Sequence, residues 1–239
     1  MAVKAESDII LLPEMFTTGF SMNAATLAED MSGSTVRWMI KMAKESEKVI
    51  AGSIMVVDEG KYYNRFIWMN PDGSYQYYDK KHLFRMANED ASYSSGSTQL
   101  IIDYKGWKIR PLICYDLRFP VWSRNKYSRN DSQYSPDYDV VLYVANWPEV
   151  RVSAWDVLLR ARAMENQAYC IGVNRVGTDG TRKNYVGHTA AIDPKGNYIL
   201  DPVHKTEGTY TVSLDKKSLE DYRSKFPQGL DADDFELTQ

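Results

Sequence analysis

Two short apolar runs constrain the fold of this chain more than any other feature. The segments Asp8–Leu12 (DIILL) and Asp139–Ala145 (DVVLYVA) are apolar almost without interruption after their first aspartate. Continuous runs of this length are typical of strands buried on both faces of a sheet. Such strands need a covering layer on each side, and helices are the usual cover, so these runs favour an α/β protein.

The remaining pattern alternates further strands with a few helices. Helical spacing of apolar residues predicts helices at Thr35–Lys48, with Ser34 as the N-cap, and at Ser153–Asn166. Turn signals separate a series of predicted strands: Val49–Val57, Phe66–Met69, Ser74–Tyr78, Gln99–Asp103, Trp107–Cys114, Tyr169–Asn174, Gly187–Asp193, Tyr198–Leu200 and Gly208–Leu214. This order predicts the α/β class with a mixed sheet or sheets.

Composition excludes several classes of function. The 239 residues are 44% apolar and 26% charged, which is typical of a soluble globular protein of one large or two small domains. The formal charge of -3 lacks the basic excess of a nucleic-acid-binding protein. No apolar run approaches the roughly 20 residues that span a bilayer. We therefore expect no nucleic-acid or membrane partner and, because the start shows no signal-peptide pattern, a cytoplasmic location.

Reactive side chains end or directly follow three of the predicted strands. The segments are Leu11–Phe20 (LLPEMFTTGF) with Glu14, Tyr78–Phe84 (YDKKHLF) with Lys80 and Lys81, and Leu112–Pro120 (LICYDLRFP) with Cys114. Taken singly, the glutamate is better explained as a surface-loop charge and the two lysines as part of a solvated turn. A cysteine at a strand-to-helix turn is different, because backbone N–H groups and nearby cations stabilise its thiolate.

Together the three segments resemble the nitrilase superfamily of carbon–nitrogen hydrolases, whose members use a Glu–Lys–Cys triad. The family patterns are matched by LPE at Leu12–Glu14, by KKHLF at Lys80–Phe84 and by CYDLRFP at Cys114–Pro120. The resemblance implies that Glu14, Lys80 and Cys114 are catalytic, and Glu89 matches a second glutamate that many members carry.

The resemblance runs from about residue 8 to the acidic tail and is strongest to the omega-amidase branch, which deamidates 2-oxo dicarboxylic acid monoamides. Later matching segments are Ala145–Pro148 (ANWP), Arg160–Tyr169 (RARAMENQAY), Asn174–Gly177 (NRVG) and Gly187–Gly196 (GHTAAIDPKG). It implies a four-layer α-β-β-α sandwich, assembled as a homodimer or larger homo-oligomer, that needs neither metal nor organic cofactor.

The expected organisation is one carbon–nitrogen hydrolase domain over residues 1–239, with 215–239 as a charged C-terminal tail. Family members usually begin with a further strand and helix before the glutamate segment, so the resemblance predicts a sandwich that lacks this opening unit. In the tail, the run Asp231–Leu237 (DADDFEL) is interpreted as a solvated end, with docking on a partner subunit as the alternative.

In the mechanism that the resemblance implies, Glu14 takes the proton of Cys114, which attacks the amide carbonyl. Lys80 and the backbone N–H of Tyr115 hold the oxyanion, and Glu89 orients Lys80 or the substrate nitrogen.

An omega-amidase must also hold a carboxylate, for which arginine is suited. Arg118 is the preferred candidate, and Arg85 and Arg175 are candidates by position only. Apolar walls are expected from Phe20, Phe84 and Trp147, although Trp147 fits an ordinary core position equally well.

Other functions remain open at this stage. A carbamoylase or another aliphatic amidase would use the same triad, and a shortened, inactive relic would keep the residues without holding them in register. A Cys–His pair with His82 or His188 as the base is a further alternative. The three histidines show no zinc-ligand spacing, and Cys170 is interpreted as a small buried hydrophobe.

Overall fold

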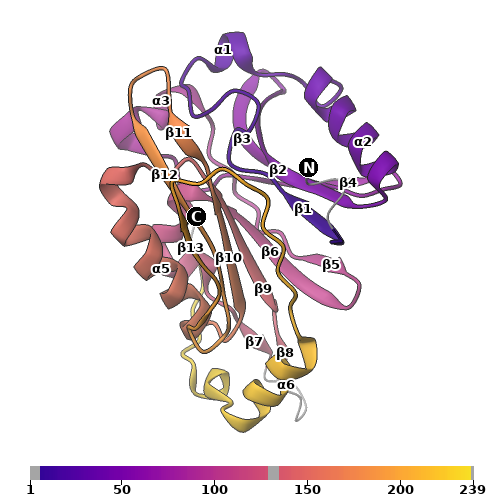
Figure 1. The fold of residues 1–239 in the computed structure, drawn as a ribbon, viewed down its shortest axis with the longest axis vertical. Coiled ribbons are helices and arrows are strands. Elements are labelled where there is room, and N and C mark those ends of the chain that lie inside the picture. Colours follow the sequence, from indigo (N-terminus) through magenta and orange to yellow (C-terminus); the bar gives the residue numbers. More distant parts are fainter. Residues whose placement is uncertain (1–5, 129–134, 238–239) are drawn as a thin grey trace.

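The structure is a computed structural model that describes residues 6–128 and 135–237, and it arranges them as two β-sheets between helices (Figure 1). The first sheet has four strands in the order β1-β2-β3-β4. The second has seven, in the order β11-β12-β10-β9-β6-β5 with β13 paired to β12, and β7 pairs with β8 in a separate small ladder. Both large sheets mix parallel and antiparallel pairs, as expected from the sequence.

The strands have the following bounds: β1 Ile9–Leu11, β2 Val49–Asp58, β3 Lys61–Met69, β4 Tyr75–Asp79, β5 Ile102–Tyr104, β6 Trp107–Ile113, β7 Tyr127–Ser128, β8 Ser135–Pro136, β9 Val140–Ala145, β10 Tyr169–Asn174, β11 Val176–Thr178, β12 Asn184–Ile192 and β13 Tyr198–His204. The α-helices are α1 Ala24–Leu27, α2 Ser34–Ser46, α3 Glu89–Ser92, α4 Pro120–Ser123, α5 Val152–Glu165 and α6 Lys216–Lys225. Short 3-10 helices are η2 Arg85–Ala87, η3 Cys114–Arg118, η4 Glu149–Arg151 and η5 Gln228–Asp231.

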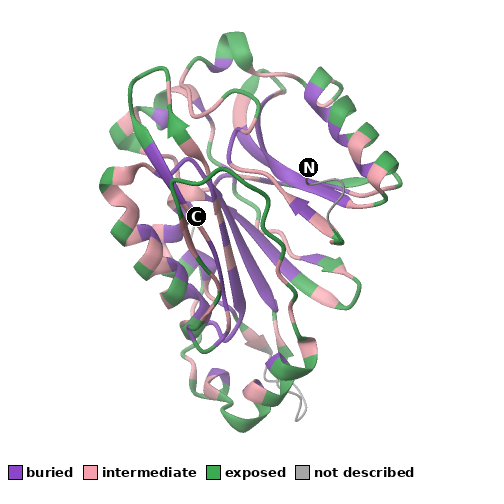
Figure 2. Cartoon of the chain, in the orientation of Figure 1, coloured by how far each residue is buried: buried purple, intermediate pink, exposed green. Residues whose placement is uncertain are grey.

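Four layers stack in the order α2, first sheet, second sheet, α5 (Figure 1). The apolar face of α2, with Val36, Met39 and Ala43, packs on the outer face of the first sheet. The inner faces of the two sheets share one apolar core, and α5 covers the second sheet through Trp155 and Leu159. The predicted α-β-β-α sandwich is confirmed, and buried residues concentrate on the strands between the helical layers (Figure 2).

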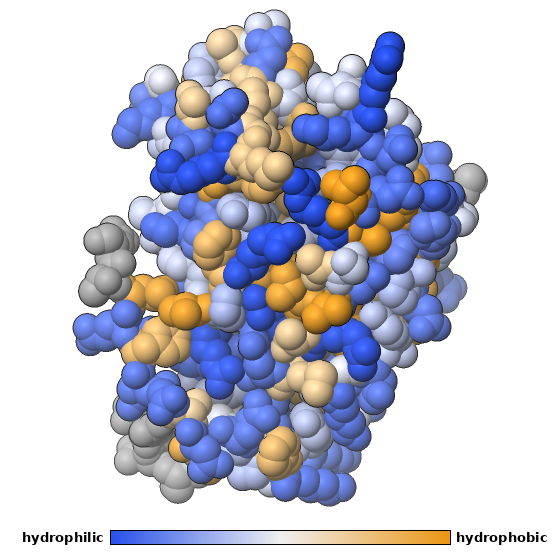
Figure 3. Space-filling view, turned by 90° about the vertical axis from the view of Figure 1, so that its left-hand side faces the viewer, coloured by the Kyte–Doolittle hydropathy of each residue, from blue (hydrophilic) through white to orange (hydrophobic). Residues whose placement is uncertain are grey.

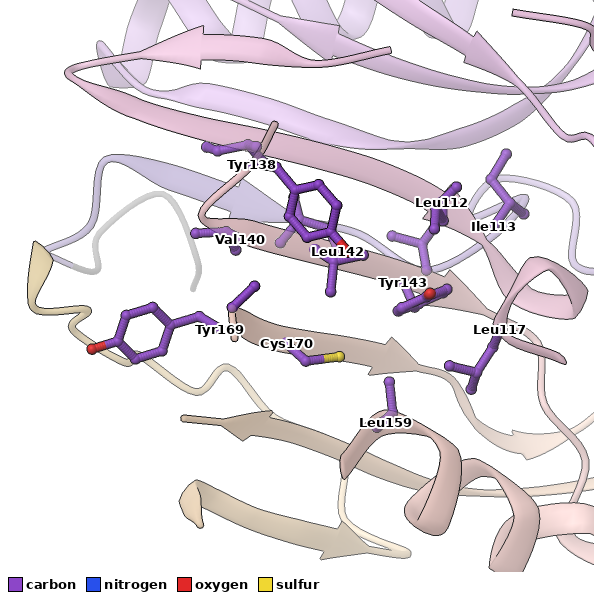
Figure 4. Packing of buried hydrophobic residues seen from close by; sticks show 14 of the residues in the cluster. Leu112, Ile113, Leu117, Tyr138, Val140, Leu142, Tyr143, Leu159, Tyr169 and Cys170 are labelled. Carbon is purple, nitrogen blue, oxygen red and sulfur yellow. The ribbon is translucent and has the colours of Figure 1, made fainter. Parts of the chain in front are cut away.

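Strand β9 lies at the centre of the second sheet and explains the uninterrupted apolar run that stood out in the sequence. All six of its residues are buried, and parallel neighbours β6 and β10 flank it on both sides. Leu142, Tyr143 and Cys170 lie among the packed side chains of this region (Figure 4). Cys170 is therefore the small buried hydrophobe that was predicted.

Two local predictions need correction. The N-cap of α2 is Gly33 and not Ser34, because the carboxylate of Glu29 accepts the Thr35 N–H at 2.8 Å and takes over the capping role. The segment Gly208–Leu214 forms no strand, because a strand needs a neighbour that shares its backbone hydrogen bonds, and no described strand pairs with it.

The charged tail is more ordered than its composition indicates. Its first part forms α6, whose N-cap Asp215 accepts the Ser218 N–H and whose Leu219 is buried. Arg223 donates to the Asp139 carboxylate at 2.7 Å and so ties the helix to the start of β9. The run Asp231–Leu237 lies beyond α6, and the last two residues of the expected tail lie outside the described residues.

On the face that carries α5, apolar patches alternate with hydrophilic side chains (Figure 3). The outer side of α5 contributes to the apolar surface, since Val157 is 66% exposed and Met164 is 48% exposed. In the part of the chain that the structure describes, no helix is long and apolar enough to cross a membrane.

The contact between α5 and β10 requires a residue without a side chain at Gly172. A Cβ added at Gly172 would lie 2.5 Å from Leu159 Cδ1 and 2.7 Å from Trp155 Cζ2. We therefore expect Gly172→Ala to lower the free energy of unfolding by about 1–3 kcal/mol, because the packed layer must move apart. Urea unfolding measures this. Gly180→Ala is the control, since no atom lies within 4 Å of its added Cβ, and equal stability of the two variants would contradict the prediction.

Candidate active site

The structure brings the side chains of Glu14, Lys80, Glu89 and Cys114 together. Glu14 follows β1, Lys80 follows β4 and Cys114 follows β6, while Glu89 opens α3. The Lys80 Nζ donates to Glu14 Oε1 at 2.9 Å and to the two oxygens of Glu89 at 2.9 and 3.0 Å. The side chains of all three charged residues are 0% exposed. The interpretation of Glu14 and Lys80 as surface charges is therefore wrong.

Lys80 remains a cation in this arrangement. Burial lowers the pKa of the ammonium, but the charges of Glu14 and Glu89 outweigh burial and raise the pKa above its ordinary value. A buried charge is tolerated only where partners surround it, and two carboxylates do so here. The ammonium is thus a fixed positive charge beside the cysteine.

The Glu14 carboxylate is held at both of its oxygens. Its Oε1 accepts from Lys80 and, at 2.8 Å, from Asn64 Nδ2. Its Oε2 accepts the backbone N–H of Asn146 at 2.8 Å, and the Asn146 side chain donates to the Glu14 main-chain oxygen at 2.6 Å. These bonds fix the direction in which the carboxylate faces.

Glu89 sits at the start of a short helix that begins after a left-handed residue, Asn88, at φ 56°. Its Oε2 accepts the Phe84 N–H at 2.6 Å. Burial raises the pKa of the Glu89 carboxyl, the charge of Glu14 raises it further, and Lys80 lowers it, with a net rise. Glu89 therefore holds a proton more readily than an ordinary glutamate.

Cys114 is the first residue of η3 and has φ 44°, in the left-handed region that side chains rarely adopt. The turn directs the thiol toward the carboxylates. Burial and the charge of Glu14 raise the pKa of the thiol well above its usual value, Lys80 lowers it, and Glu89 and a hydrogen bond with Glu14 raise it again. The thiol is thus protonated at neutral pH, and any reaction as a nucleophile would require a base.

Asp116 stabilises this strained turn through hydrogen bonds. It is 0% exposed, and its Oδ2 accepts the Ile113 N–H at 3.0 Å and the Tyr78 hydroxyl at 2.8 Å. Its Oδ1 accepts the His82 N–H at 3.0 Å and contacts His82 Nδ1 at 2.8 Å. One carboxylate therefore joins the end of the cysteine strand to the loop that carries Lys80.

The expected substrate-binding residues lie at different depths. The Phe20 ring centre is 5.3 Å from Lys80 Nζ, and Phe84 packs against Tyr115 with ring centres 5.0 Å apart, so both rings border the charged cluster. Trp147 is 2% exposed within the main core, and the Arg118 guanidinium lies 4.9 Å from its ring centre.

The other two arginines differ in their surroundings. Arg85 is 85% exposed and paired with Asp90 at 2.7 Å, which places it in solvent. Arg175 lies over the Tyr185 ring at 4.7 Å.

His82 and His188 have carboxylate partners of their own. His82 contacts Asp116, and His188 contacts Asp156 at 2.9 Å and His204 at 2.8 Å. Within residues 6–128 and 135–237, no group of three or more His, Cys, Asp or Glu side chains has an arrangement that could hold a metal ion.

A cavity of about 1040 Å³ lies next to the charged cluster but does not coincide with it. It is lined by Glu14 but by none of Lys80, Glu89 and Cys114, and it extends between β1 and the segment 206–214.

Three supporting residues were not found from the sequence. Asp116 and Asn146 lie inside segments that had been noticed, CYDLRFP and ANWP, and their neighbours were the only signal. Asn64 is a polar residue in a strand that is otherwise buried and apolar from Phe66 onward, and nothing in the local pattern links it to Glu14.

Comparisons with known proteins identify relatives of this chain. A family model described as carbon-nitrogen hydrolase matches residues 1–224. Omega-amidase YafV of Escherichia coli K12 is 46% identical over 232 residues, which cover 96% of this chain and 86% of the relative. The 2-oxoglutaramate amidase of Bacillus subtilis is 32% identical over 224 residues, with 92% and 83% covered. The crystal structure of XC1258 from Xanthomonas campestris, described as a CN-hydrolase superfamily protein with an arsenic adduct in its active site, superposes with a TM-score of 0.92 at 43% identity and covers 99% of this chain and 88% of that one.

Asp116 makes four hydrogen-bond contacts near the turn, so we expect the stability of the turn to depend strongly on its carboxylate. We expect Asp116→Asn to lower the free energy of unfolding by about 2–3 kcal/mol, because an amide turns donors toward N–H groups that need an acceptor. Urea unfolding followed by tryptophan fluorescence measures the change. The control is Asp103→Asn, an exposed position in β5, and the prediction fails where both variants unfold at the same urea concentration.

Proposed function

Because the chain belongs to the carbon–nitrogen hydrolase family of the nitrilase superfamily, we propose that it is an omega-amidase that releases ammonia from the terminal amide of 2-oxoglutaramate or 2-oxosuccinamate. The names of its relatives, omega-amidase and 2-oxoglutaramate amidase, support this substrate class over carbamoyl compounds. The chain is an amidohydrolase that acts on a small molecule.

The observation that carries the proposal is the buried cluster in which one ammonium lies between two carboxylates beside a strained cysteine. Amides are weak electrophiles with a poor leaving group, so the reaction needs a strong nucleophile, a proton acceptor and a charge that stabilises an oxyanion. Cys114, Glu14 and Lys80 supply these three functions in our proposal.

The reaction begins when Glu14 removes the thiol proton of Cys114 and the sulfur attacks the amide carbonyl carbon. The carbonyl oxygen becomes an oxyanion, which the Lys80 ammonium and the backbone N–H of Tyr115 stabilise. The C–N bond then breaks, Glu14 returns its proton to the leaving nitrogen, and ammonia departs. A thioester remains on Cys114.

Water completes the cycle. Glu14 takes one proton from a water molecule as the oxygen attacks the thioester carbonyl, and the same two donors hold the second oxyanion. Collapse breaks the C–S bond, yields the carboxylic acid and returns the proton to the sulfur. Glu89 makes two contacts with Lys80, which support its role in keeping the ammonium in place.

The remote carboxylate of the substrate needs a cation. We assign it to Arg118, which lies four residues after the nucleophile, has no ion pair among the described residues and stacks on Trp147. Phe20 and Phe84 would line the path of the carbon chain beside the charged cluster.

We further propose that the protein acts as a homodimer or larger homo-oligomer in the cytoplasm. The apolar side chains exposed on α5, such as Val157, support an interface between copies. The free thiols of Cys114 and Cys170 support a reducing compartment.

The nucleophile is tested by Cys114→Ala. We expect the purified wild type to release ammonia from 2-oxoglutaramate and 2-oxosuccinamate, and we expect the variant to lose activity by a factor of at least about 10³ while keeping its fold. Cys170→Ala is the matched control, because it removes the other cysteine, which lies in the core. Activity that survives in Cys114→Ala, or release only from a carbamoyl amino acid, would contradict the proposal.

The carboxylate contact is tested by Arg118→Met, which keeps the length of the side chain and removes its charge. We expect KM for 2-oxoglutaramate to rise by about 10- to 100-fold, the size expected for a lost charged hydrogen bond, with kcat/KM for a neutral amide such as butyramide unchanged. Arg85→Met, at an exposed arginine, is the control. Equal losses on both substrates would assign Arg118 a structural role instead.

A further inference from the structure

Asn64 contacts three members of the charged cluster. It lies in β3, opposite Met55 of β2, and is fully buried. Its side-chain Nδ2 donates to Glu14 Oε1 at 2.8 Å and lies 3.5 Å from Glu89 Oε1. Its main-chain oxygen accepts the Lys80 N–H at 3.0 Å. One residue thus touches the base, the lysine and the second glutamate.

The other end of the same amide is unsatisfied. Among the described residues, no donor reaches the buried Asn64 Oδ1. An unpaired buried acceptor is destabilising, so an apolar residue of similar size would pack here more favourably. The donor end is therefore the part of the side chain that explains an asparagine at this position.

The cluster contains two carboxyl groups and one ammonium, so ionisation of both carboxyl groups would leave an excess of negative charge. Glu14 and Glu89 share a single ammonium, and like charges this close favour protonation of one of them. A hydrogen bond from an amide N–H favours the ionised form of the group that accepts it. Because Asn64 lies 2.8 Å from Glu14 and 3.5 Å from Glu89, it favours ionised Glu14.

We propose that Asn64 is a positioning residue of the amidase reaction, whose side-chain amide keeps Glu14 ionised and aimed at Cys114 so that Glu14, and not Glu89, acts as the base. This inference rests on the proposed function. The raised pKa of Glu89 agrees with it, since Glu89 then binds a proton more readily than an ordinary glutamate does.

The charged groups around Glu14 allow a pH test. Lys80 and Cys114 face it, as do Glu89 and the hydroxyls of Tyr93 and Tyr185. The pKa of the lysine, the thiol and both tyrosines is raised, for the tyrosines by burial first, and stays above neutral pH. An acid limb below neutral pH therefore reports the two carboxyl groups.

The variant Asn64→Leu removes the donor and the unpaired acceptor and keeps the number and branching of the side-chain heavy atoms. We expect the acid limb of two profiles, the alkylation of Cys114 by iodoacetamide and kcat/KM for 2-oxoglutaramate, to move up by about one pH unit, which is a tenfold loss of rate below the limb. We expect thermal stability to be unchanged or higher. Asn64→Asp is the second variant and shifts the limb in the same direction, because a third carboxyl group strengthens proton binding.

The control is Asn125→Ala. Asn125 is also buried and also donates twice, to the main-chain oxygens of Tyr138 and Asn166, but it contacts none of the charged cluster. It should lower the melting temperature and leave both pH profiles in place. Mass spectrometry of the labelled peptide, with Cys114→Ala as the blank, assigns the alkylation to Cys114.

The outcomes separate this inference from the proposed function. A shifted alkylation profile in a protein that releases no ammonia from any amide supports the role of Asn64 and overturns the substrate. An active wild type whose limb does not move in either Asn64 variant overturns the inference. Failure of both Asn64 variants to fold also overturns it, because that result assigns Asn64 to stability alone.

Discussion

The burial of Lys80 between Glu14 and Glu89 is the interaction on which the rest of the structure depends. Removing three charges from water costs several kcal/mol for each ion, and only short contacts in a complete arrangement offset that cost. The three side chains follow β1, follow β4 and open α3, so the cluster also fixes where these segments end. A chain that places any one of them wrongly leaves an unpaired charge in its interior.

The α/β class and most of the strands were predictable from local periodicity, whereas the four-layer sandwich was implied by the resemblance to the nitrilase superfamily. Uninterrupted apolar runs indicated strands with cover on both faces, and β9 with six buried residues is such a strand. The pairing of strands depends on residues that are far apart in the sequence, and the wrong strand prediction arose from this. Gly208–Leu214 has the composition of a strand but no described neighbour, and α6 is held by Arg223 on the distant Asp139. Neither fact has a signature within a window of ten residues.

The same distinction applies to the site. Glu14, Lys80 and Cys114 each follow a strand within a short motif, so they could be selected from the sequence. The residues that orient them could not, because the contacts cross the chain: Asn146 and Glu14 are 132 residues apart, and Asn64 and Glu14 are 50 apart. Their donors are a backbone N–H and a strand asparagine, which no chemical motif marks. The sequence therefore indicates candidate reactive groups, while the structure shows which hydrogen bonds hold their side chains in place.

The proposed base and the proposed nucleophile come from different sheets, and this separation links reactivity to packing. Glu14 is carried by the first sheet and Cys114 by the second, so the distance between them is set by the apolar core that the two inner faces share. The left-handed turn at Cys114 stores strain of about 1–3 kcal/mol, which persists only while surrounding bonds outweigh it. Asp116 supplies two of those bonds, because its carboxylate accepts the Ile113 N–H at the turn and the His82 N–H in the loop that carries Lys80. Loosening the core would thus relax the turn and move the thiol from its base before the protein unfolds, since displacements of about one ångström at reacting groups are enough to lose on the order of a hundredfold in rate.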